Sequence, residues 1–158
     1  MIAVLQRVKR AAVRVEGEVV GSCRTGLFVL LGVAKGDSEE DARVLAEKIV
    51  ALRIFKDENE KMNLSLADVD GEMLTVSNFT LLASYKKGKR PDYFAAAAPD
   101  EANRLYEYFC SLVSEKVRRA EKGVFGADME IETVCDGPVT IVMDSNVLLK
   151  KTTMTEKA

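Results

Sequence analysis

Apolar and polar positions along the chain predict several β-strands. Apolar residues alternate loosely over residues 1–15, and Glu16-Gly17 then turns this strand into a hairpin partner over residues 18–20. Residues 26–33 are apolar on both faces, as in a central strand. Shorter alternating or β-branched runs predict further strands over residues 62–66, 74–82, 129–134 and 139–143.

Helical spacing of apolar residues occurs twice between these strands. Ser38 followed by Asp41 has the form of a helix N-cap with a weak capping-box partner, and the spacing then predicts a helix over residues 39–54. Pro99 with two acidic residues after it begins a second helix, whose apolar face continues to about residue 120. The sequence therefore predicts two helices among the strands.

The composition indicates one domain that needs neither metal nor cofactor. The chain has 158 residues, enough to bury roughly two-thirds of its surface on folding. We expect one domain over residues 1–145 and, because the chain then becomes polar, a disordered tail over residues 146–158. Three cysteines without CxxC spacing argue against a zinc site or a disulfide framework. The absence of histidine excludes a catalytic triad with a histidine base.

Charge and hydropathy predict where the protein acts. The net charge is only −2, so no global field draws the chain to a membrane or to DNA, and any polyanion must meet a local basic patch. No apolar run approaches the roughly 18 residues of a membrane span, and the N-terminus lacks the cleavage pattern of a signal peptide. We therefore expect a cytoplasmic protein.

Three polar residues interrupt the apolar stretch over residues 74–82. They are Ser77, Asn78 and Thr80, short side chains that both donate and accept hydrogen bonds. Polar groups on an apolar strand suit a site that orients a small molecule or an ester. The alternative is an edge strand whose polar residues face water.

A basic loop follows over residues 85–93. Its four cations lie between two tyrosines, a combination that suits the end of a single-stranded nucleic acid. The alternative is a solvated turn. The cations are Lys86, Lys87, Lys89 and Arg90.

Gly137-Pro138 lies between the two last predicted strands. Proline removes a backbone donor and fixes φ, while glycine lets a ligand or another backbone approach closely. The alternative is an ordinary turn between strands.

These motifs resemble those of the D-aminoacyl-tRNA deacylase family, also called the D-tyrosyl-tRNA deacylase family. Ser77-Asn78-Phe79-Thr80 is similar to its Ser-Gln-x-Thr motif, and residues 135–140 are similar to its Asn-x-Gly-Pro-x-Thr motif. The chain also opens with a similar Gln6-Arg7-Val8 strand, and the resemblance covers about residues 1–144 in order. Asn78 stands in place of the family's glutamine and Cys135 in place of its asparagine.

The resemblance implies an α/β fold, a single domain with a barrel-like β-sheet packed with two main helices, working as a homodimer. Members of the family hydrolyse the ester between a D-amino acid, or glycine, and the 3′-terminal adenosine of tRNA, which recycles mischarged tRNA. In the family a cis Gly-Pro peptide enters the active site of the partner subunit and leaves no room for an L side chain. Carried over, Gly137 and Pro138 form this gate.

The resemblance also assigns the remaining site residues. The catalytic stretch is Ser77, Asn78, Phe79 and Thr80, with the main-chain amides around Phe79 and Thr80 as oxyanion donors. The pocket is lined by Ala97, Phe125 and Met129, and the partners are aminoacyl-tRNA and a second subunit. Because no base is present to activate Thr80, we favour assistance by the ribose 2′-hydroxyl. The alternatives are a catalytically attenuated protein that binds tRNA ends, and a hydrolase that uses the Cys135 thiol.

Overall fold

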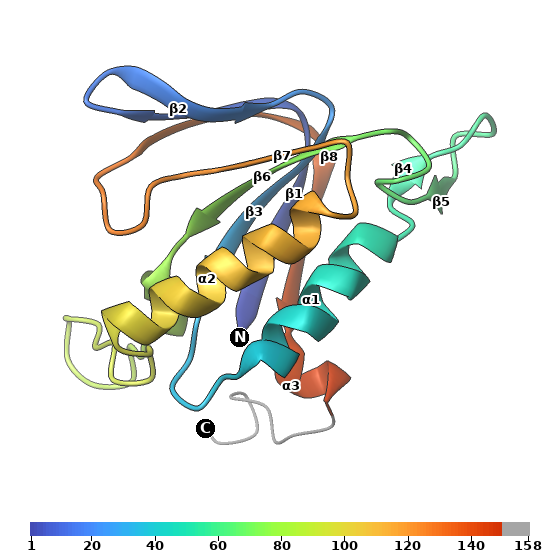
Figure 1. Ribbon diagram of the computed structural model, residues 1–158. Coiled ribbons are helices and arrows are strands. Elements are labelled where there is room, and N and C mark those ends of the chain that lie inside the picture. Colours follow the sequence, from blue (N-terminus) through green and yellow to red (C-terminus); the bar gives the residue numbers. More distant parts are fainter. Residues whose placement is uncertain (150–158) are drawn as a thin grey trace.

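The computed structural model describes residues 1–149, and a single curved β-sheet dominates them (Figure 1). The long first strand β1 (Ile2–Val15) lies in its middle. The first half of β1 pairs antiparallel with β3 (Gly26–Gly32) and the second half with β2 (Glu18–Cys23). Along its other side β1 pairs antiparallel with β8 (Glu130–Asp144). The strands predicted over residues 1–15 and 26–33 and the hairpin between them are confirmed.

The sheet continues beyond β3 through two parallel pairings. β6 (Glu72–Ser77) lies beside β3, and β7 (Arg119–Lys122) lies beside β6, so the order along the sheet is β2-β1-β3-β6-β7. A separate two-stranded sheet joins β4 (Phe55–Lys56) to β5 (Met62–Leu64), which places a strand within the predicted 62–66. The predicted α/β class is confirmed.

Side chains close the sheet into an almost complete barrel where β2 meets β7. The Ser22 amide donates to the Glu121 carboxylate at 3.1 Å, and the Arg119 guanidinium donates to the Ser22 hydroxyl at 3.3 Å. A Cβ on Gly21 would lie only 2.7 Å from the Lys122 carbonyl oxygen, so glycine is required for this approach. The predicted barrel-like sheet is therefore confirmed for one subunit.

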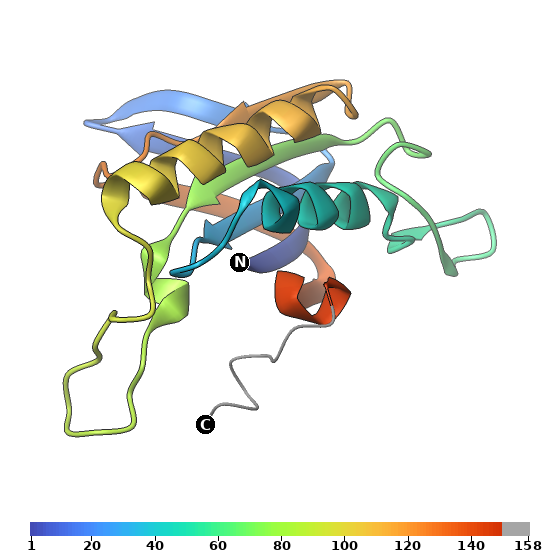
Figure 2. The same ribbon diagram turned by 60° about the horizontal axis from the view of Figure 1, so that its bottom comes forward.

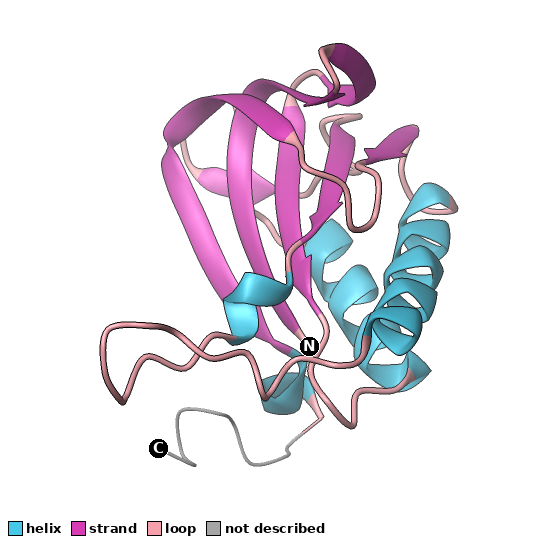
Figure 3. Ribbon diagram, turned by 90° about the vertical axis from the view of Figure 1, so that its left-hand side faces the viewer, coloured by secondary structure: helices cyan, strands magenta, loops and turns pink. Residues whose placement is uncertain are grey.

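Two helices cover one face of the sheet. α1 (Glu39–Ala51) and α2 (Pro99–Ser114) lie side by side across it (Figures 1 and 2). Figure 3 shows this arrangement from the side, with the curved strands on the left and the two helices on the right. The main core lies between these layers and includes Leu5, Leu31, Leu45, Ile49, Leu105 and Phe109. A second apolar cluster lies on the other face of the sheet and includes Val8, Phe28, Leu74 and Val76.

Both helices end earlier than their apolar spacing predicts. α1 ends at Ala51 instead of residue 54, and α2 ends at Ser114 instead of residue 120. Val117 still packs against the core, which extends the apparent helical pattern. Residues 119–122 instead form β7, because parallel pairing with β6 outweighs a sequence that has no strand pattern of its own.

The last strand is continuous, whereas the sequence predicted two strands with a turn between them. Val8 pairs with Cys135 and Gln6 with Thr140, so β8 advances by five residues while β1 advances by two. The extra residues bulge out of the ladder, and this bulge contains the Gly137-Pro138 bond, which is cis.

A short helix, α3 (Ser145–Leu148), follows β8 directly. Residues 146–148 of the predicted tail are therefore ordered in a helix, and Ser145 is fully buried at its start. Residues 150–158 of that tail lie outside the described residues. No helix in residues 1–149 is long and apolar enough to cross a membrane.

Candidate active site

A cavity of about 670 Å³ opens beside the end of β6. Buried apolar side chains line one part of it, and exposed side chains line the part that we call its rim. The buried members are Val33, Val76 and Ala102, and the rim includes Phe79, Tyr93, Asp128 and Ile131. The volume and the apolar lining are typical of a site for a small organic ligand.

Most of the predicted site residues line this one cavity. Ser77, Asn78 and Phe79 come from the end of β6, and Ala97, Phe125 and Met129 come from segments on either side of α2. Thr80 does not line the cavity, but it donates hydrogen bonds to the Asn78 side chain, which does. Gly137 and Pro138 do not line it, so these two predicted site residues lie apart from the others in this chain.

The predicted strand over residues 74–82 is wrong in its second half. β6 ends at Ser77, and Phe79–Leu82 form a 3₁₀-helix, η1, with Asn78 as its N-cap. The Asn78 Oδ1 atom accepts from the Thr80 amide at 3.3 Å and from the Thr80 hydroxyl at 2.5 Å. Asn78 is half-buried and Thr80 is exposed, so these polar groups serve a helix start and not a buried strand.

The start of η1 lies beside the cavity. The first N–H groups of a helix have no acceptor within that helix. Phe79 begins η1, and its neighbours Asn78 and Ser77 line the cavity with it. The Asn78 amide is already used, since it donates to the Leu31 carbonyl at 2.8 Å and continues the pairing of β6 with β3.

Arg7 holds the bulge that carries Gly137-Pro138. Its side chain is only 4% exposed. Its guanidinium donates to the Asp136 carbonyl at 3.0 Å and to the Ile54 carbonyl at 2.7 Å, and it lies 3.4 Å from the Asp136 carboxylate. Gly137 and Pro138 themselves are exposed.

Sequence reasoning assigned no role to Arg7. A signal was present, because Met1, Ala3 and Leu5 point inward on β1 and Arg7 continues the same alternation. A buried arginine requires partners. Tyr93 and Asp128 were also missed as cavity residues, because only the fold brings them to the rim.

The basic loop projects away from the body of the protein (Figure 2). Its ends are joined by Ser84 and Asp92, whose main chains exchange hydrogen bonds at 2.8 and 2.9 Å. Residues 86–90 are all exposed. Tyr93, directly after this closure, reaches the cavity rim, so the loop and the cavity are adjacent.

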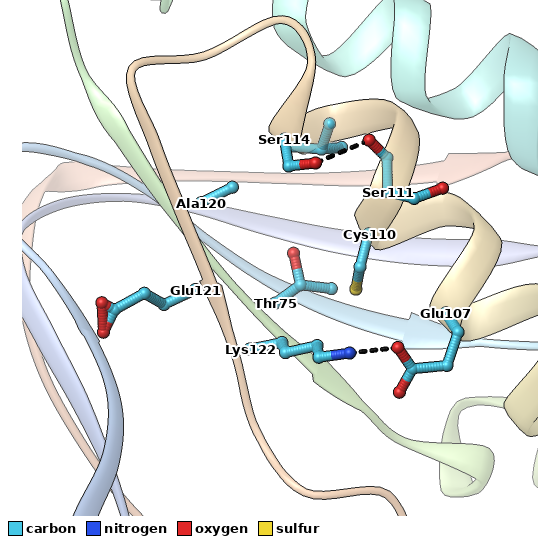
Figure 4. A pocket seen from close by; sticks show the side chains of 9 residues that line it. Thr75, Glu107, Cys110, Ser111, Ser114, Ala120, Glu121 and Lys122 are labelled. Carbon is cyan, nitrogen blue, oxygen red and sulfur yellow. Dashed lines mark hydrogen bonds and ion pairs between the residues drawn. The ribbon is translucent and has the colours of Figure 1, made fainter.

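A second, smaller hollow of about 190 Å³ lies between α2 and β7 (Figure 4). An ion pair between Lys122 and Glu107 borders it, and Cys110 contributes its thiol. Burial raises the pKa of Cys110 to about 12, so this thiol stays protonated at neutral pH and is a poor nucleophile. This hollow therefore lacks the chemistry of an ester-cleaving site.

The remaining thiols do not add to the site. Cys135 is exposed and does not line the large cavity, while Cys23 is buried and its pKa is raised to about 11, mainly by burial. Within residues 1–149, no three His, Cys, Asp or Glu side chains lie close enough together to hold a metal ion.

Comparison with known proteins relates most of the chain to one family. The profile of the D-Tyr-tRNA(Tyr) deacylase family matches residues 4–144. A D-aminoacyl-tRNA deacylase of Caldicellulosiruptor saccharolyticus is 55% identical over 145 residues, which cover 92% of this chain and 97% of the relative. The corresponding protein of Koribacter versatilis is 57% identical over 145 residues, with the same coverage of each chain.

Solved structures agree with this relationship. A protein described as a c-Myc DNA unwinding element binding protein superposes with a TM-score of 0.86 at 37% identity, covering 91% of this chain and 98% of that one. A probable eukaryotic D-amino acid tRNA deacylase superposes with a TM-score of 0.77 at 18% identity, covering 90% and 98%, and supports the fold alone. The chain belongs to the D-Tyr-tRNA(Tyr) deacylase family.

Proposed function

We propose that this protein hydrolyses the ester between a D-amino acid, or glycine, and the 3′-terminal adenosine of tRNA. The observation that carries the proposal is the cavity formed around Ser77, Asn78 and Phe79 in a chain of this family. In the reaction, water adds to the ester carbonyl and the bond to the ribose oxygen breaks. The products are the free amino acid and the 3′-hydroxyl of the tRNA.

A main-chain amide carries the catalysis in this proposal. The Phe79 amide at the start of η1 donates to the oxyanion that forms when water adds, whereas the Thr80 amide is held by the Asn78 side chain. Such a donor contributes several kcal/mol. The neighbouring ribose 2′-hydroxyl positions the water. The Thr80 hydroxyl donates to the Asn78 amide oxygen, which is too weak a base to activate it as a nucleophile.

Chirality is controlled by Gly137 and Pro138 of a second subunit. They lie exposed on the bulge of β8, outside the cavity of their own chain, and Arg7 fixes the preceding residue. Inserted into the partner's cavity, their backbone occupies the space of an L side chain. The active protein is therefore a homodimer, and we place it in the cytoplasm, where aminoacyl-tRNA is used.

The test compares D-tyrosyl-tRNA with L-tyrosyl-tRNA as substrates. We expect rapid release of D-tyrosine and almost none of L-tyrosine, with no loss of rate in a chelator. Ala97→Phe, which fills the cavity, should abolish release, whereas Ser111→Ala on the far side of α2 should not. Equal hydrolysis of both substrates would contradict the proposed gate. Tight binding of D-tyrosyl-tRNA without hydrolysis would instead identify a protein that only binds tRNA ends.

Subunit mixing tests the composite site. Ala97→Phe spoils the cavity, and Gly137→Val, with its side chain at the inserted tip, spoils the gate. If the gate acts in trans, mixed dimers contain one intact cavity that faces one intact gate, and D-specific activity returns on mixing. A monomeric protein with full D-specificity would overturn the homodimer.

A further inference from the structure

The first strand carries exposed cations at the corner where it changes partners. Up to Val8, β1 pairs with β3, and from Ala11 onward it pairs with β2. The two residues between these pairings are Lys9 and Arg10, and both are exposed. The short connection from β2 to β3 begins with Arg24, which is also exposed. We call Lys9, Arg10 and Arg24 the corner cations.

The register of the strands brings the corner cations together. Ala11 faces Cys23 across the ladder of β1 and β2, so the next residues on the two strands, Arg10 and Arg24, lie close to each other. Facing residues in such a ladder are only about 5 Å apart. Lys9 directly precedes Arg10. Like charges at this spacing repel one another, and an anion that binds between them relieves the repulsion.

No carboxylate neutralises the corner cations within residues 1–149. None of the three forms an ion pair in this part of the chain. The acidic residues on the adjoining strands are each paired with another arginine: Glu72 with Arg118 and Arg119, Glu132 with Arg14, and Asp136 with Arg7. The corner is therefore a positive surface on a chain whose net charge is −2.

The corner lies between the rim of the large cavity and the bulge of β8. Arg10 faces Val134 on β8. Val134 is three residues from Ile131, which lines the cavity, and three residues from Gly137 of the bulge. Three residues of a strand span about 10 Å. Phosphates follow one another every few ångströms along a nucleic-acid strand. An RNA whose 3′ end enters the cavity therefore has phosphates within reach of the corner.

We propose that Lys9, Arg10 and Arg24 bind backbone phosphates of the tRNA whose 3′ end occupies the cavity. This inference rests on the proposed function and adds a contact surface that is separate from the loop over residues 85–93. Ammonium and guanidinium groups both bind phosphate, and such contacts orient the nucleic acid without reading its sequence. Because the whole chain is weakly acidic, RNA is attracted only where uncompensated cations gather.

Two substrates separate phosphate binding from ester cleavage. D-tyrosyl-tRNA carries phosphates, whereas the D-tyrosyl ester of adenosine carries none. In the variant Lys9→Gln, Arg10→Gln, Arg24→Gln we expect kcat/KM for D-tyrosyl-tRNA to fall by about tenfold or more at low salt. The value for the adenosine ester should not change, which also shows that the variant is folded.

The matched control removes the same amount of charge elsewhere. Lys48→Gln, Lys61→Gln, Lys116→Gln replaces three exposed cations outside the corner and lowers the net charge equally. It should leave kcat/KM for both substrates nearly unchanged. A local contact with phosphates is thereby distinguished from a general effect of net charge.

The salt dependence of binding provides the second measurement. The probe is tRNA that carries D-tyrosine in a non-hydrolysable amide linkage, and its binding is followed by fluorescence anisotropy over a range of potassium chloride concentrations. Loss of three phosphate contacts should reduce the slope of log K against log salt by about 2 to 3. Lys9→Arg, Arg10→Lys, Arg24→Lys keeps the charges and should keep the slope.

Three results would overturn the phosphate surface. One is an unchanged slope in the glutamine variant, and another is an equal loss in the matched control. The third is a change in oligomeric state of the glutamine variant, measured by light scattering, which would assign the corner to a subunit contact. Binding of the amide-linked tRNA that depends on the corner, by a protein that cleaves neither substrate, would keep the surface and refute the proposed hydrolysis.

Discussion

Asn78 shows how one side chain organises the segment over residues 77–80 beside the cavity. It stands in place of a glutamine in the family motif, and the structure uses it as the cap of η1. A shorter amide is well suited to this cap, since its oxygen reaches both the amide and the hydroxyl of Thr80. The substitution therefore keeps the main chain of the site in place.

Exchange at Asn78 should accordingly alter the rate less than a catalytic group would. We expect Asn78→Gln to change deacylation by less than about tenfold, which corresponds to the loss of one ordinary hydrogen bond. Asn78→Ala removes the cap and should lower stability by about 0.5–2 kcal/mol. The free energy of unfolding and the rate with D-tyrosyl-tRNA are measured for each, with Asn78→Asp, which keeps the acceptor, as control. If the natural protein were inactive and Asn78→Gln made it active, the side chain at position 78 would be a catalytic group.

Arg7 connects two residues that lie far apart in the sequence, Ile54 through its carbonyl and Asp136 through its carbonyl and its carboxylate. A lysine has a single cationic centre and cannot repeat this planar arrangement. Arg7→Lys should cost about 1–3 kcal/mol of stability and should reduce the ratio of D- to L-tyrosine release by about tenfold or more. Urea unfolding and the two release rates measure these effects.

Arg14→Lys is the matched control for Arg7→Lys, because Arg14 lies on the same strand and forms an exposed ion pair with Glu132 at 3.0 Å. Such exposed pairs contribute little to stability. Equal effects of both replacements would refute a special role of Arg7 in holding the gate.

The cysteines differ in reactivity because they differ in burial. Burial holds the pKa of Cys110 near 12, so its alkylation by iodoacetamide should be slow at pH 7 and should accelerate only in strongly alkaline solution. Cys135 is exposed and should be alkylated first. We expect alkylated protein and Cys135→Ala to keep most of the deacylation rate, as measured with D-tyrosyl-tRNA. Complete loss of activity in folded Cys135→Ala would establish a thiol mechanism.

At the scale of elements, the loop over residues 85–93 behaves as a unit. The main-chain exchange between Ser84 and Asp92 closes it, and the closure holds Tyr93 at the rim whatever the lysines contact. Its cations and the Tyr93 ring can thus act independently of each other.

Replacing Lys86, Lys87 and Lys89 by alanine tests the electrostatic part. Each lost phosphate contact on single-stranded RNA should reduce the slope of log K against log salt by about 0.7. tRNA binding should therefore weaken mostly at low salt, as measured by fluorescence anisotropy over a range of potassium chloride concentrations. Lys48→Ala with Lys61→Ala, two exposed cations outside the loop, is the control. An unchanged slope would show that the loop is only a solvated turn.

The register between β1 and β8 explains why the two halves of β8 could be predicted as strands, whereas the bulge between them could not. Both halves of β8 have strand patterns, and both pair with β1. The sequence between them contains Gly-Pro, which is also a common turn signal. Pairing of Cys135 and Thr140 with the same strand turns this segment into a bulge, which a local pattern cannot express.

At the scale of the whole molecule, Ser145 joins the two ends of the described chain. Its hydroxyl accepts from the Met1 ammonium at 2.9 Å and donates to the Asp41 carboxylate at 2.7 Å, and its amide donates to the Met1 carbonyl at 2.9 Å. Met1 also forms an ion pair with Asp37 at 2.8 Å. Because this network is buried, it fixes α3 and the start of β1 against α1.

Ser145→Ala should destabilise the protein although Ser145 does not line the large cavity. Hydrogen bonds to charged groups contribute about 1.5–3 kcal/mol each, so we expect a loss of about 2–4 kcal/mol and a fall in Tm of roughly 4–15 °C. Calorimetry measures the Tm, and activity well below it should stay normal. Ser111→Ala, an exposed helix serine, should change Tm little. An unaltered Tm for Ser145→Ala would show that the network adds nothing.

The sequence alone determined the α/β class, the first strands, the starts of both long helices and the family motifs. These features depend on residues that are close in the chain, where apolar period, caps and turn residues act directly. The family motifs indicated Ser77, Ala97, Phe125 and Met129 as site residues, and all four line one cavity in the structure.

Only the tertiary structure decided the rest. Arg7 binds Asp136 across 129 residues of sequence, β7 is a strand because β6 lies beside it, and Phe79 meets Tyr93 at a rim that neither segment forms alone. The physical reason is common to all three. Each depends on contacts between distant segments, and the free energy of such contacts is defined only after the sheet has closed and the helices have packed on it.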